Sequence, residues 1–299
     1  MKIRVLGSGA GGGLPQWNCN CNNCKNCRLG LIQKRTQSSL AVSLNNNKWI
    51  LINSSPEFTT QINELLTDYN HETLIRSQMI NDIILMDSQM DHITGLLSMR
   101  ENRTLNIYCN ENTYDEIYNK FNILEILSYY LNIKHTFINE NQSFKVDTIP
   151  EIEFIPIYLD SKPPPFSKNR ENPIKGNNLG LIIKEVEKEE YIFYAPGISS
   201  IDEKIANIIK KSKFSLIDGT FWHNEELINM QISKKDSKSM GHIPNIELIK
   251  IVNKYELFNK IYLIHINNTN PILDPESEEY KKIIESKIKI SYDKLELNI

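Results

Sequence analysis

Residues 83–95 of the chain read IILMDSQMDHITG. The first four residues form a short apolar run of the buried-strand type, and Asp87, Asp91 and His92 follow it directly. Functional groups of globular proteins gather where strands end in loops. The stretch therefore predicts a buried strand that delivers carboxylates and a histidine to one end of a sheet.

The same arrangement recurs toward the C-terminus. Asp218 ends the apolar run 214–217, and His265 ends the apolar run 261–264. His242 lies in a predicted loop. A single histidine is more often a hydrogen-bonded structural group than a ligand. Several such residues at strand ends together favour one functional site.

Cysteines are concentrated near the N-terminus. Four of the five form a C-x-C-x-x-C-x-x-C run, namely Cys19, Cys21, Cys24 and Cys27. Thiolates this close together suit one tetrahedral ion, and such clustering in an intracellular chain indicates metal rather than disulfides. We expect a structural Zn(II), with Cys27 or a residue from a distant loop as the fourth ligand. Free thiols and an iron–sulfur cluster are the alternatives.

Composition limits the classes of function. Among 299 residues, 34 are basic and 37 acidic, so the formal net charge is −3 and binding of nucleic acid through bulk charge is not expected. No apolar run approaches the roughly 20 residues of a membrane span, and the N-terminal run is too short for a signal peptide. We expect a cytoplasmic protein without membrane insertion.

The glycines at 7–12 match the G-x-G-x-x-G pattern of dinucleotide sites after a strand. Pro15 follows where a helix would have to begin, and no acidic residue precedes Glu57. A tight exit from the strand is therefore the favoured interpretation. The seven basic residues before Glu57 are either solvated surface groups or part of a pocket for an anionic ligand.

Strand and helix patterns alternate without an internal repeat or a linker. Strands are predicted at 2–6, 40–44, 49–53, 83–86, 105–109, 153–158, 179–186, 191–194, 214–217, 261–264 and 288–291. Helices are predicted at 58–66, 112–130, 201–211, 245–255 and 276–286. This order favours two mixed sheets with helices outside, in one domain over 1–299 that carries the cysteine loop 19–27. The Pro-rich stretch 161–178 predicts a long functional or mobile loop.

The polar strand ends resemble the metallo-β-lactamase superfamily. Asp91, His92 and Gly95 are similar to the second half of its H-x-H-x-D-H-x-x-G motif, Asp218 to its bridging aspartate and His265 to its final histidine. Over nearly its whole length the chain more closely resembles the coenzyme PQQ (pyrroloquinoline quinone) synthesis protein B family. The segments that carry this resemblance are 1–12, 15–21, 35–39, 87–100, 193–197, 218–220, 240–242 and 264–273. The resemblance implies an α/β (α+β) fold, an αββα sandwich of two mixed sheets with flanking helices.

The ligand set differs from that of the hydrolytic relatives, in which the first two histidines of the motif hold one of two metals. Here Asp87 and Gln89 stand at those positions, so we expect the first metal position to be lost. The remaining candidate ligands are Asp91, His92 and His265, with Asp218 as a fourth ligand or a nearby base. Two imidazoles and a carboxylate suit non-haem Fe(II), and they suit two-metal hydrolysis poorly.

The resemblance further implies a role in PQQ biosynthesis, as an Fe(II)- and O2-dependent hydroxylase of the tyrosine ring in a peptide-derived Glu–Tyr precursor. A soluble carrier that moves PQQ or its precursor toward the periplasm is the alternative, and a metal-dependent hydrolase is a third interpretation. We expect an anionic small-molecule or dipeptide-derived substrate, other proteins of the PQQ pathway as partners, and a homodimer. His242 is the predicted proton relay. The predicted substrate contacts are Arg35, Gln37, Ser38 and Asn268.

Overall fold

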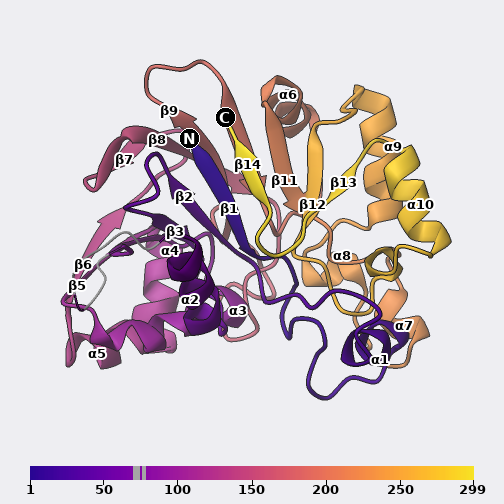
Figure 1. Ribbon diagram of the computed structural model, residues 1–299, viewed down its shortest axis with the longest axis horizontal. Coiled ribbons are helices and arrows are strands. Elements are labelled where there is room, and N and C mark those ends of the chain that lie inside the picture. Colours follow the sequence, from indigo (N-terminus) through magenta and orange to yellow (C-terminus); the bar gives the residue numbers. More distant parts are fainter. Residues whose placement is uncertain (70–74, 76–78) are drawn as a thin grey trace.

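The computed structural model describes residues 1–69, 75 and 79–299 and contains two sheets that face each other between outer layers of helices (Figure 1). The first sheet has the order β14-β1-β2-β3-β4-β5-β6, and the second has the order β13-β12-β11-β10-β9-β8-β7. The strands of the first are β1 (Lys2–Gly7), β2 (Ser39–Ser43), β3 (Ile50–Ile52), β4 (Asp82–Ile84), β5 (Thr104–Cys109), β6 (Asn132–Phe137) and β14 (Glu296–Asn298). Those of the second are β7 (Phe144–Val146), β8 (Ile149–Leu159), β9 (Asn178–Glu185), β10 (Tyr191–Ala195), β11 (Phe214–Asp218), β12 (Ile261–Ile264) and β13 (Lys289–Ile290). The predicted αββα sandwich is confirmed.

Both sheets are mixed, and their parallel parts carry the polar strand ends. In the first sheet, β3, β4, β5 and β6 pair in parallel, while β14, β1, β2 and β3 are antiparallel. In the second, β10 to β13 pair in parallel and β7 to β10 are antiparallel. Parallel strands end at the same edge of a sheet, so the residues after β11 and β12 lie side by side in the second sheet, while those after β4 lie at an edge of the first.

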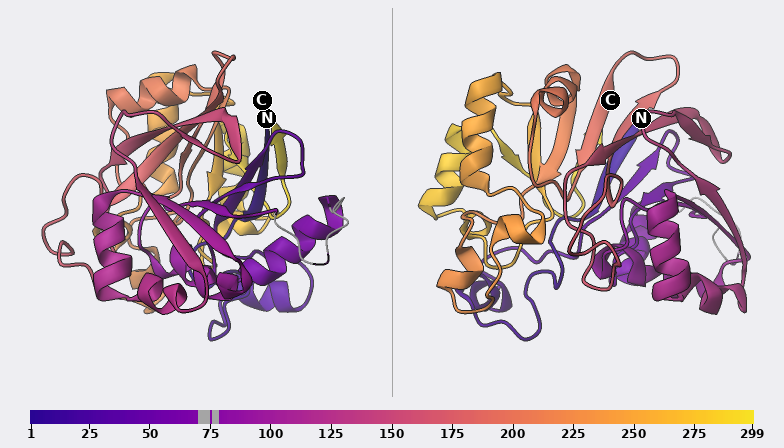
Figure 2. Two further views of the ribbon diagram at one scale, coloured as in Figure 1. Left: turned by 90° about the vertical axis from the view of Figure 1, so that its left-hand side faces the viewer. Right: turned by 180° about the vertical axis from the view of Figure 1, so that it is seen from behind.

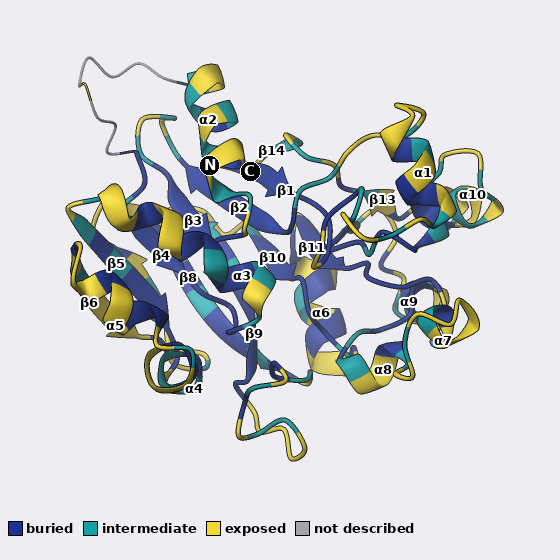
Figure 3. Ribbon diagram, turned by 90° about the horizontal axis from the view of Figure 1, so that it is seen from below, coloured by how far each residue is buried: buried dark blue, intermediate teal, exposed yellow. Residues whose placement is uncertain are grey.

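Apolar side chains fill three layers. Alternate residues of the facing strands, such as Val5 and Ile52 against Phe154 and Leu181, form the layer between the sheets. The other two layers lie between each sheet and its outer helices. Figure 3 shows strands that are mostly buried and helices with exposed outer sides. Burying each large apolar side chain contributes roughly 1.5–3 kcal/mol, which makes these layers the main source of stability.

Helices cover both outer faces, as the views in Figure 2 also show. The helices on the first sheet are α2 (Phe58–Tyr69), α3 (Met90–Ile93), α4 (Glu111–Asp115) and α5 (Ile123–Ser128). Those on the second are α6 (Glu203–Lys211), α9 (Asn245–Tyr255) and α10 (Glu278–Glu285). The short helices α1 (Asn22–Arg28), α7 (Glu226–Asn229) and α8 (Ser237–Met240) lie at the lower right of Figure 1. Across the described ranges, no helix combines the length and apolar character needed to cross a bilayer.

One helix prediction is wrong. The stretch 112–130 forms α4, a π-helical segment (Glu116–Lys120) and α5 instead of one continuous helix. Asn122 adopts a left-handed conformation with φ of 54° and interrupts the helical path. Glu116 at the π-helical segment is buried and accepts hydrogen bonds from Ser88 and Ser167. These long-range contacts decide a local structure that helical periodicity alone does not reveal.

Candidate metal centre

The structure brings together the three predicted ligands of the first metal set. Asp91 and His92 belong to α3, and His265 directly follows β12. Asp91 Oδ2 lies 3.0 Å from His265 Nε2 and 3.9 Å from His92 Nε2. One ligand atom from each residue fits within 4.8 Å of the other two. Residues as far as 174 positions apart in the chain therefore form one compact donor group.

Asp87 orients His92 rather than joining this donor group. Its Oδ1 lies 2.7 Å from His92 Nδ1 and also accepts from the backbone N–H of Gln89. This bond directs the other ring nitrogen, Nε2, toward Asp91. Nε2 is buried and has no hydrogen-bond partner among the described residues. Leaving such an atom unpaired costs about 1–3 kcal/mol, so the geometry fits a bound metal ion.

His265 is oriented in the same manner by Thr220. Thr220 Oγ1 lies 3.0 Å from His265 Nδ1 and donates to Asp218 Oδ1 at 2.6 Å. With Nδ1 engaged, His265 presents Nε2 to Asp91. His265 has a φ of 58°, a left-handed conformation that non-glycine residues adopt rarely and often at functional sites.

Asp218, which is buried, and His242, which is half-buried, form a pair beside the three candidate ligands. Asp218 Oδ2 accepts from His242 Nδ1 at 2.6 Å and from the backbone N–H of Ile198 at 3.1 Å. Its Oδ1 accepts from the N–H and the hydroxyl of Thr220. One ligand atom each from Asp218, His242 and His265 also fits within 4.8 Å. Because both carboxylate oxygens already accept hydrogen bonds, the arrangement favours Asp218 as the partner of His242 over Asp218 as a fourth ligand.

The carboxylates set the charge of the centre. Burial lowers the pKa of His92, but Asp87 and Asp91 outweigh burial and raise it to about 9. Burial would raise the pKa of Asp91, yet His92 and the hydrogen bond from His265 hold it well below its ordinary value. The pKa of His242 lies above its ordinary value because Asp218 outweighs the effect of burial. The site thus favours cations, whether protons or a metal ion.

A pocket of about 340 Å³ opens onto this centre. Asp91, His92, His242 and His265 line it together with three basic residues that the sequence analysis did not identify. These are Lys162, Arg170 and Lys235. Lys162 and Arg170 belong to the loop between β8 and β9, which falls within the stretch predicted to be functional or mobile. The loop was therefore visible in the sequence, but its position over the centre was not.

The structure places the four predicted substrate contacts outside this pocket. Arg35 donates to Ser8 Oγ at 2.9 Å and to the carbonyl oxygen of Ser291. Gln37 binds the Gly12 N–H and Glu57, and Ser38 Oγ lies 3.2 Å from the Tyr194 hydroxyl. Asn268 points toward the cysteines. All four side chains make hydrogen bonds inside the protein and do not face the pocket. Lys162, Arg170 and Lys235 therefore replace them as candidate substrate contacts.

Three of the four predicted zinc ligands converge. The sulfur atoms of Cys19, Cys21 and Cys24 lie within 4.8 Å of one another at the start of α1. The backbone N–H groups of Cys21 and Cys24 donate to the sulfurs of Cys19 and Cys21. Cys27 lies outside this group and is buried among apolar residues of the second sheet's outer layer. Its assignment as a ligand is corrected because the helix turns its thiol toward the core.

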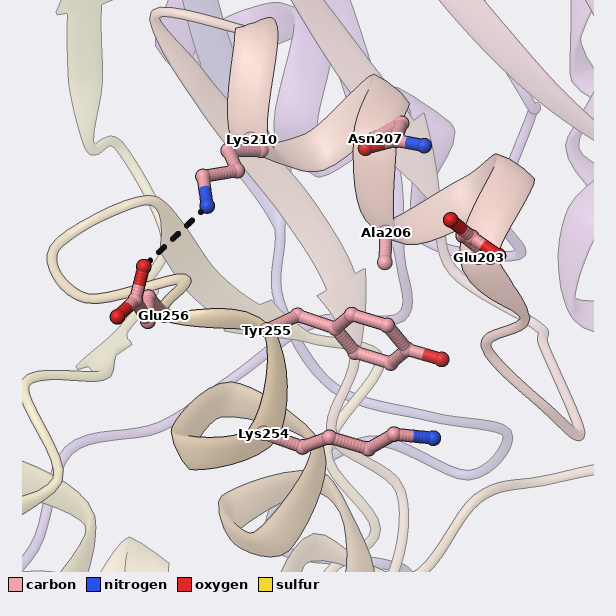
Figure 4. A pocket seen from close by; sticks show the side chains of 7 residues that line it. All are labelled: Glu203, Ala206, Asn207, Lys210, Lys254, Tyr255 and Glu256. Atoms are coloured by element: carbon pink, nitrogen blue, oxygen red, sulfur yellow. Dashed lines mark hydrogen bonds and ion pairs between the residues drawn. The ribbon is translucent and has the colours of Figure 1, made fainter.

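A second pocket, of about 160 Å³, lies between α6 and the C-terminal end of α9 (Figure 4). Lys210 there approaches Glu256 at 3.4 Å, and Lys254 and Tyr255 line the opposite side. None of the predicted site residues lines this pocket. The candidate site is therefore the pocket that contains the Asp91, His92 and His265 cluster.

Comparison with known proteins identifies the family of the chain. Residues 48–266 match the family model of the β-lactamase superfamily domain. Coenzyme PQQ synthesis protein B of Acinetobacter baumannii (strain AYE) is 38% identical over 305 residues, and the alignment covers 100% of both chains. The protein of that name from Methylococcus capsulatus is 38% identical, with 99% of each chain covered. The crystal structure of Zn(2+)-bound PqqB from Methylobacterium extorquens matches at a TM-score of 0.86, with 26% identity and 100% coverage of both chains. The chain belongs to the coenzyme PQQ synthesis protein B family of the β-lactamase superfamily.

Proposed function

We propose that this protein acts in PQQ biosynthesis as a mononuclear Fe(II)- and O2-dependent hydroxylase of the tyrosine ring in a Glu–Tyr-derived precursor. The observation that carries the proposal is the donor set: two imidazoles and one carboxylate converge, and Asp87 is engaged with His92 instead of serving a second metal. This set is typical of non-haem Fe(II) oxygenases. Bound iron would supply O2 activation.

The pocket supports an anionic substrate. Lys162, Arg170 and Lys235 line it together with Asp87 and Asp91. Guanidinium and ammonium groups bind carboxylates through charge-assisted hydrogen bonds. A precursor that carries several carboxylates would be held at these residues with its ring toward the ligand cluster.

His242 is suited to move a proton at the substrate. Its Nδ1 is tied to Asp218, so Nε2 is the nitrogen that it offers to the pocket. The carboxylate stabilises the protonated imidazole after the phenol gives up its proton. In the balanced reaction, one oxygen atom of O2 enters the ring and the other leaves as water. A soluble two-electron reductant supplies the electrons.

Anaerobic metal analysis of wild type and His92→Ala tests this proposal. After loading with Fe(II) and Zn(II), wild type is expected to retain one iron beyond the zinc of the cysteine site, and His92→Ala to lose only the iron. His223→Ala is a matched control, because His223 is exposed and lies outside the pocket. The precursor should stimulate O2 consumption in wild type and in the control, and not in His92→Ala.

Other outcomes contradict the hydroxylase. Two metal equivalents at the centre, in addition to the zinc, would indicate a hydrolase. Tight binding of PQQ or its precursor that survives His92→Ala, without O2 consumption in wild type, would indicate a carrier.

A further inference from the structure

The loop 160–177 between β8 and β9 packs against the helical stretch 110–121 that follows β5. This loop contributes Lys162 and Arg170 to the pocket. Three contacts join the two segments along their lengths. They are the ion pair of Lys168 with Asp115 at 2.8 Å, the stacked rings of Phe166 and Phe121, whose centroids lie 5.9 Å apart, and the hydrogen bond from Asn110 Nδ2 to the carbonyl oxygen of Gly176. The helical stretch therefore holds the middle and the end of the loop.

Glu116 adds a fourth contact, and this one is buried. Its Oε1 accepts a hydrogen bond from Ser167 Oγ, and its Oε2 accepts one from Ser88 Oγ. All three residues are buried. A buried carboxylate without partners is unfavourable, and a hydroxyl that donates to a charged acceptor forms a strong hydrogen bond. One carboxylate thus joins the β8–β9 loop to the loop that follows β4.

The Ser88 side of this bridge leads to the metal centre. Ser88 directly follows Asp87, whose Oδ1 lies 2.7 Å from His92 Nδ1. Gln89, the next residue, donates through Nε2 to the carbonyl oxygen of Lys162 at 3.2 Å. The loop after β4 therefore contacts the β8–β9 loop both through Glu116 and directly.

The Ser167 side of the bridge leads to the pocket cations. The N–H of Asn169 donates to Ser167 Oγ at 3.1 Å, and the N–H of Arg170 donates to the carbonyl oxygen of Ser167 at 3.2 Å. The Arg170 guanidinium donates in turn to the carbonyl oxygen of Pro163, the residue after Lys162. A displacement of Ser167 therefore displaces both cations.

We propose that Glu116 is a positioning residue for the reaction, which holds Lys162 and Arg170 at a fixed place relative to Asp87 and the metal centre. Because the proposed substrate binds these cations through its carboxylates, the hold sets the affinity for substrate. Only this second part rests on the proposed function, because the contacts of Glu116 exist in the protein without metal or substrate.

Limited trypsin digestion of the full-length protein tests the hold on the loop without metal or substrate. Cleavage after Lys168 and Arg170, followed by mass spectrometry, reports opening of the loop. Cleavage after the exposed Lys188, in the β9–β10 hairpin, reports changes elsewhere. Because both hydroxyls lose their acceptor, Glu116→Ala is expected to speed cleavage after Lys168 and Arg170 at least about tenfold, and to leave cleavage after Lys188 unchanged within about twofold.

Three further variants complete the digestion experiment. Glu116→Gln keeps the shape of the side chain, one acceptor oxygen and a donor for the second hydroxyl, so it should be cleaved like wild type. Glu125→Ala, which removes an exposed carboxylate from α5, should also be cleaved like wild type. Ser167→Ala removes only the hydroxyl of the loop and should speed cleavage of the loop. It decides the matter if Glu116→Ala does not fold.

Substrate kinetics test the second part. Glu116→Ala should raise KM for the precursor about tenfold with a smaller change in kcat, and Glu116→Gln should restore the wild-type KM. The variant Lys162→Gln/Arg170→Gln lacks both cations. In this background, Glu116→Ala should change kcat/KM by less than about twofold, because the side chains that it positions are no longer present.

Each part of the proposal can fail separately. Wild-type cleavage after Lys168 and Arg170 in Glu116→Ala, or equal acceleration after Lys188, shows that Glu116 does not hold this loop. Faster cleavage of the loop with an unchanged KM, or an undiminished effect of Glu116→Ala in the variant without the cations, shows that the hold does not set substrate affinity. If wild type does not consume O2 with the precursor, the proposed function fails, and the digestion still decides the first part.

Discussion

Asp87 stands at a motif position that holds a metal-binding histidine in the hydrolytic relatives, and here it has a different role. Where the hydrolase motif has a metal-binding histidine, Asp87 accepts the Nδ1 proton of His92 at 2.7 Å and directs Nε2 to the centre. A carboxylate behind a metal-binding imidazole raises its basicity and fixes its orientation. In the proposed metal centre, the same position would therefore support the remaining metal instead of holding a second one.

Asp87→Asn tests this role. The amide is a weaker acceptor than the carboxylate, so we expect the affinity of the centre for Fe(II) or Co(II) to fall about 10–100-fold, with the fold retained. Metal titration followed by absorption measures the change. Asp115→Asn, which removes a surface partner of Lys168, should leave the affinity unchanged. Equal affinity in Asp87→Asn and wild type would contradict the positioning role.

A second prediction for a single residue concerns Lys162. It lines the pocket, whereas Lys168 in the same loop is exposed and pairs with Asp115. We expect Lys162→Gln to raise KM about tenfold with little change in kcat, because a substrate carboxylate loses roughly 1.4 kcal/mol of binding in both ground and transition states. Steady-state kinetics should show no effect of Lys168→Gln. A fall in kcat alone would assign Lys162 to the chemical step.

Among the elements, the interrupted helical stretch 111–128 after β5 contacts two loops that line the pocket. Glu116, in its π-helical segment, accepts hydrogen bonds from Ser88, in the loop between β4 and α3, and from Ser167, in the loop between β8 and β9. The segment thus ties together two loops that contribute to the pocket. Burial raises the pKa of Glu116, and the two serine hydroxyls offset only part of the rise.

This pKa shift predicts a pH dependence of stability. A carboxyl whose pKa is higher in the folded than in the unfolded state binds protons more strongly when folded. Its stabilising contribution is present below the unfolded pKa of about 4.3 and is lost as pH rises through the folded pKa. Glu116→Gln stays neutral, so the unfolding free energy of wild type relative to this variant should fall from pH 4.5 to pH 7.

Urea unfolding at the two pH values measures this difference. Glu278→Gln is the control, because Glu278 is exposed and its pKa is lowered by Lys281. Its difference from wild type should be small and of opposite sign. A pH-independent difference for Glu116→Gln would show that the carboxyl ionises alike in the folded and unfolded states.

At the scale of the whole molecule, the C-terminal segment 293–298 contacts the loop after β1 and the residues before β2. Asp293 accepts from the N–H and hydroxyl of Ser8, after β1, and from those of Thr36, before β2. Strand β14 then pairs with β1 at the edge of the first sheet. The last residues of the chain thus hold the first loop, which in turn contacts Ile266.

Asp293→Ala is expected to lower the unfolding free energy by roughly 2–4 kcal/mol, because four donors lose a charged acceptor in a half-buried setting. Urea unfolding measures the loss. Lys294→Ala removes only an exposed ion pair with Glu64 and should change stability by less than about 1 kcal/mol. Similar values for the two variants would contradict a structural role of Asp293.

The sequence alone predicted the sandwich architecture and the convergence of Asp91, His92 and His265. These features depend on local information: apolar runs end at a polar residue, and residues at motif spacing share one short helix. Periodicity also predicted α9 (Asn245–Tyr255) and β12 (Ile261–Ile264) with their observed bounds. It missed β6, whose side chains are mostly exposed, and β14, which is short.

Only the tertiary structure decided which polar side chains face the pocket and which are used internally. Arg35 reaches Ser291 across 256 positions, and Asn268 reaches Cys19 across 249. Residue type shows what a side chain can bind. The partner that it meets depends on how distant segments pack and which rotamers remain open, and no local pattern contains that information. For this reason the candidate ligands followed from the motif, while the positions of Cys27, Arg35 and the basic pocket residues required the folded chain.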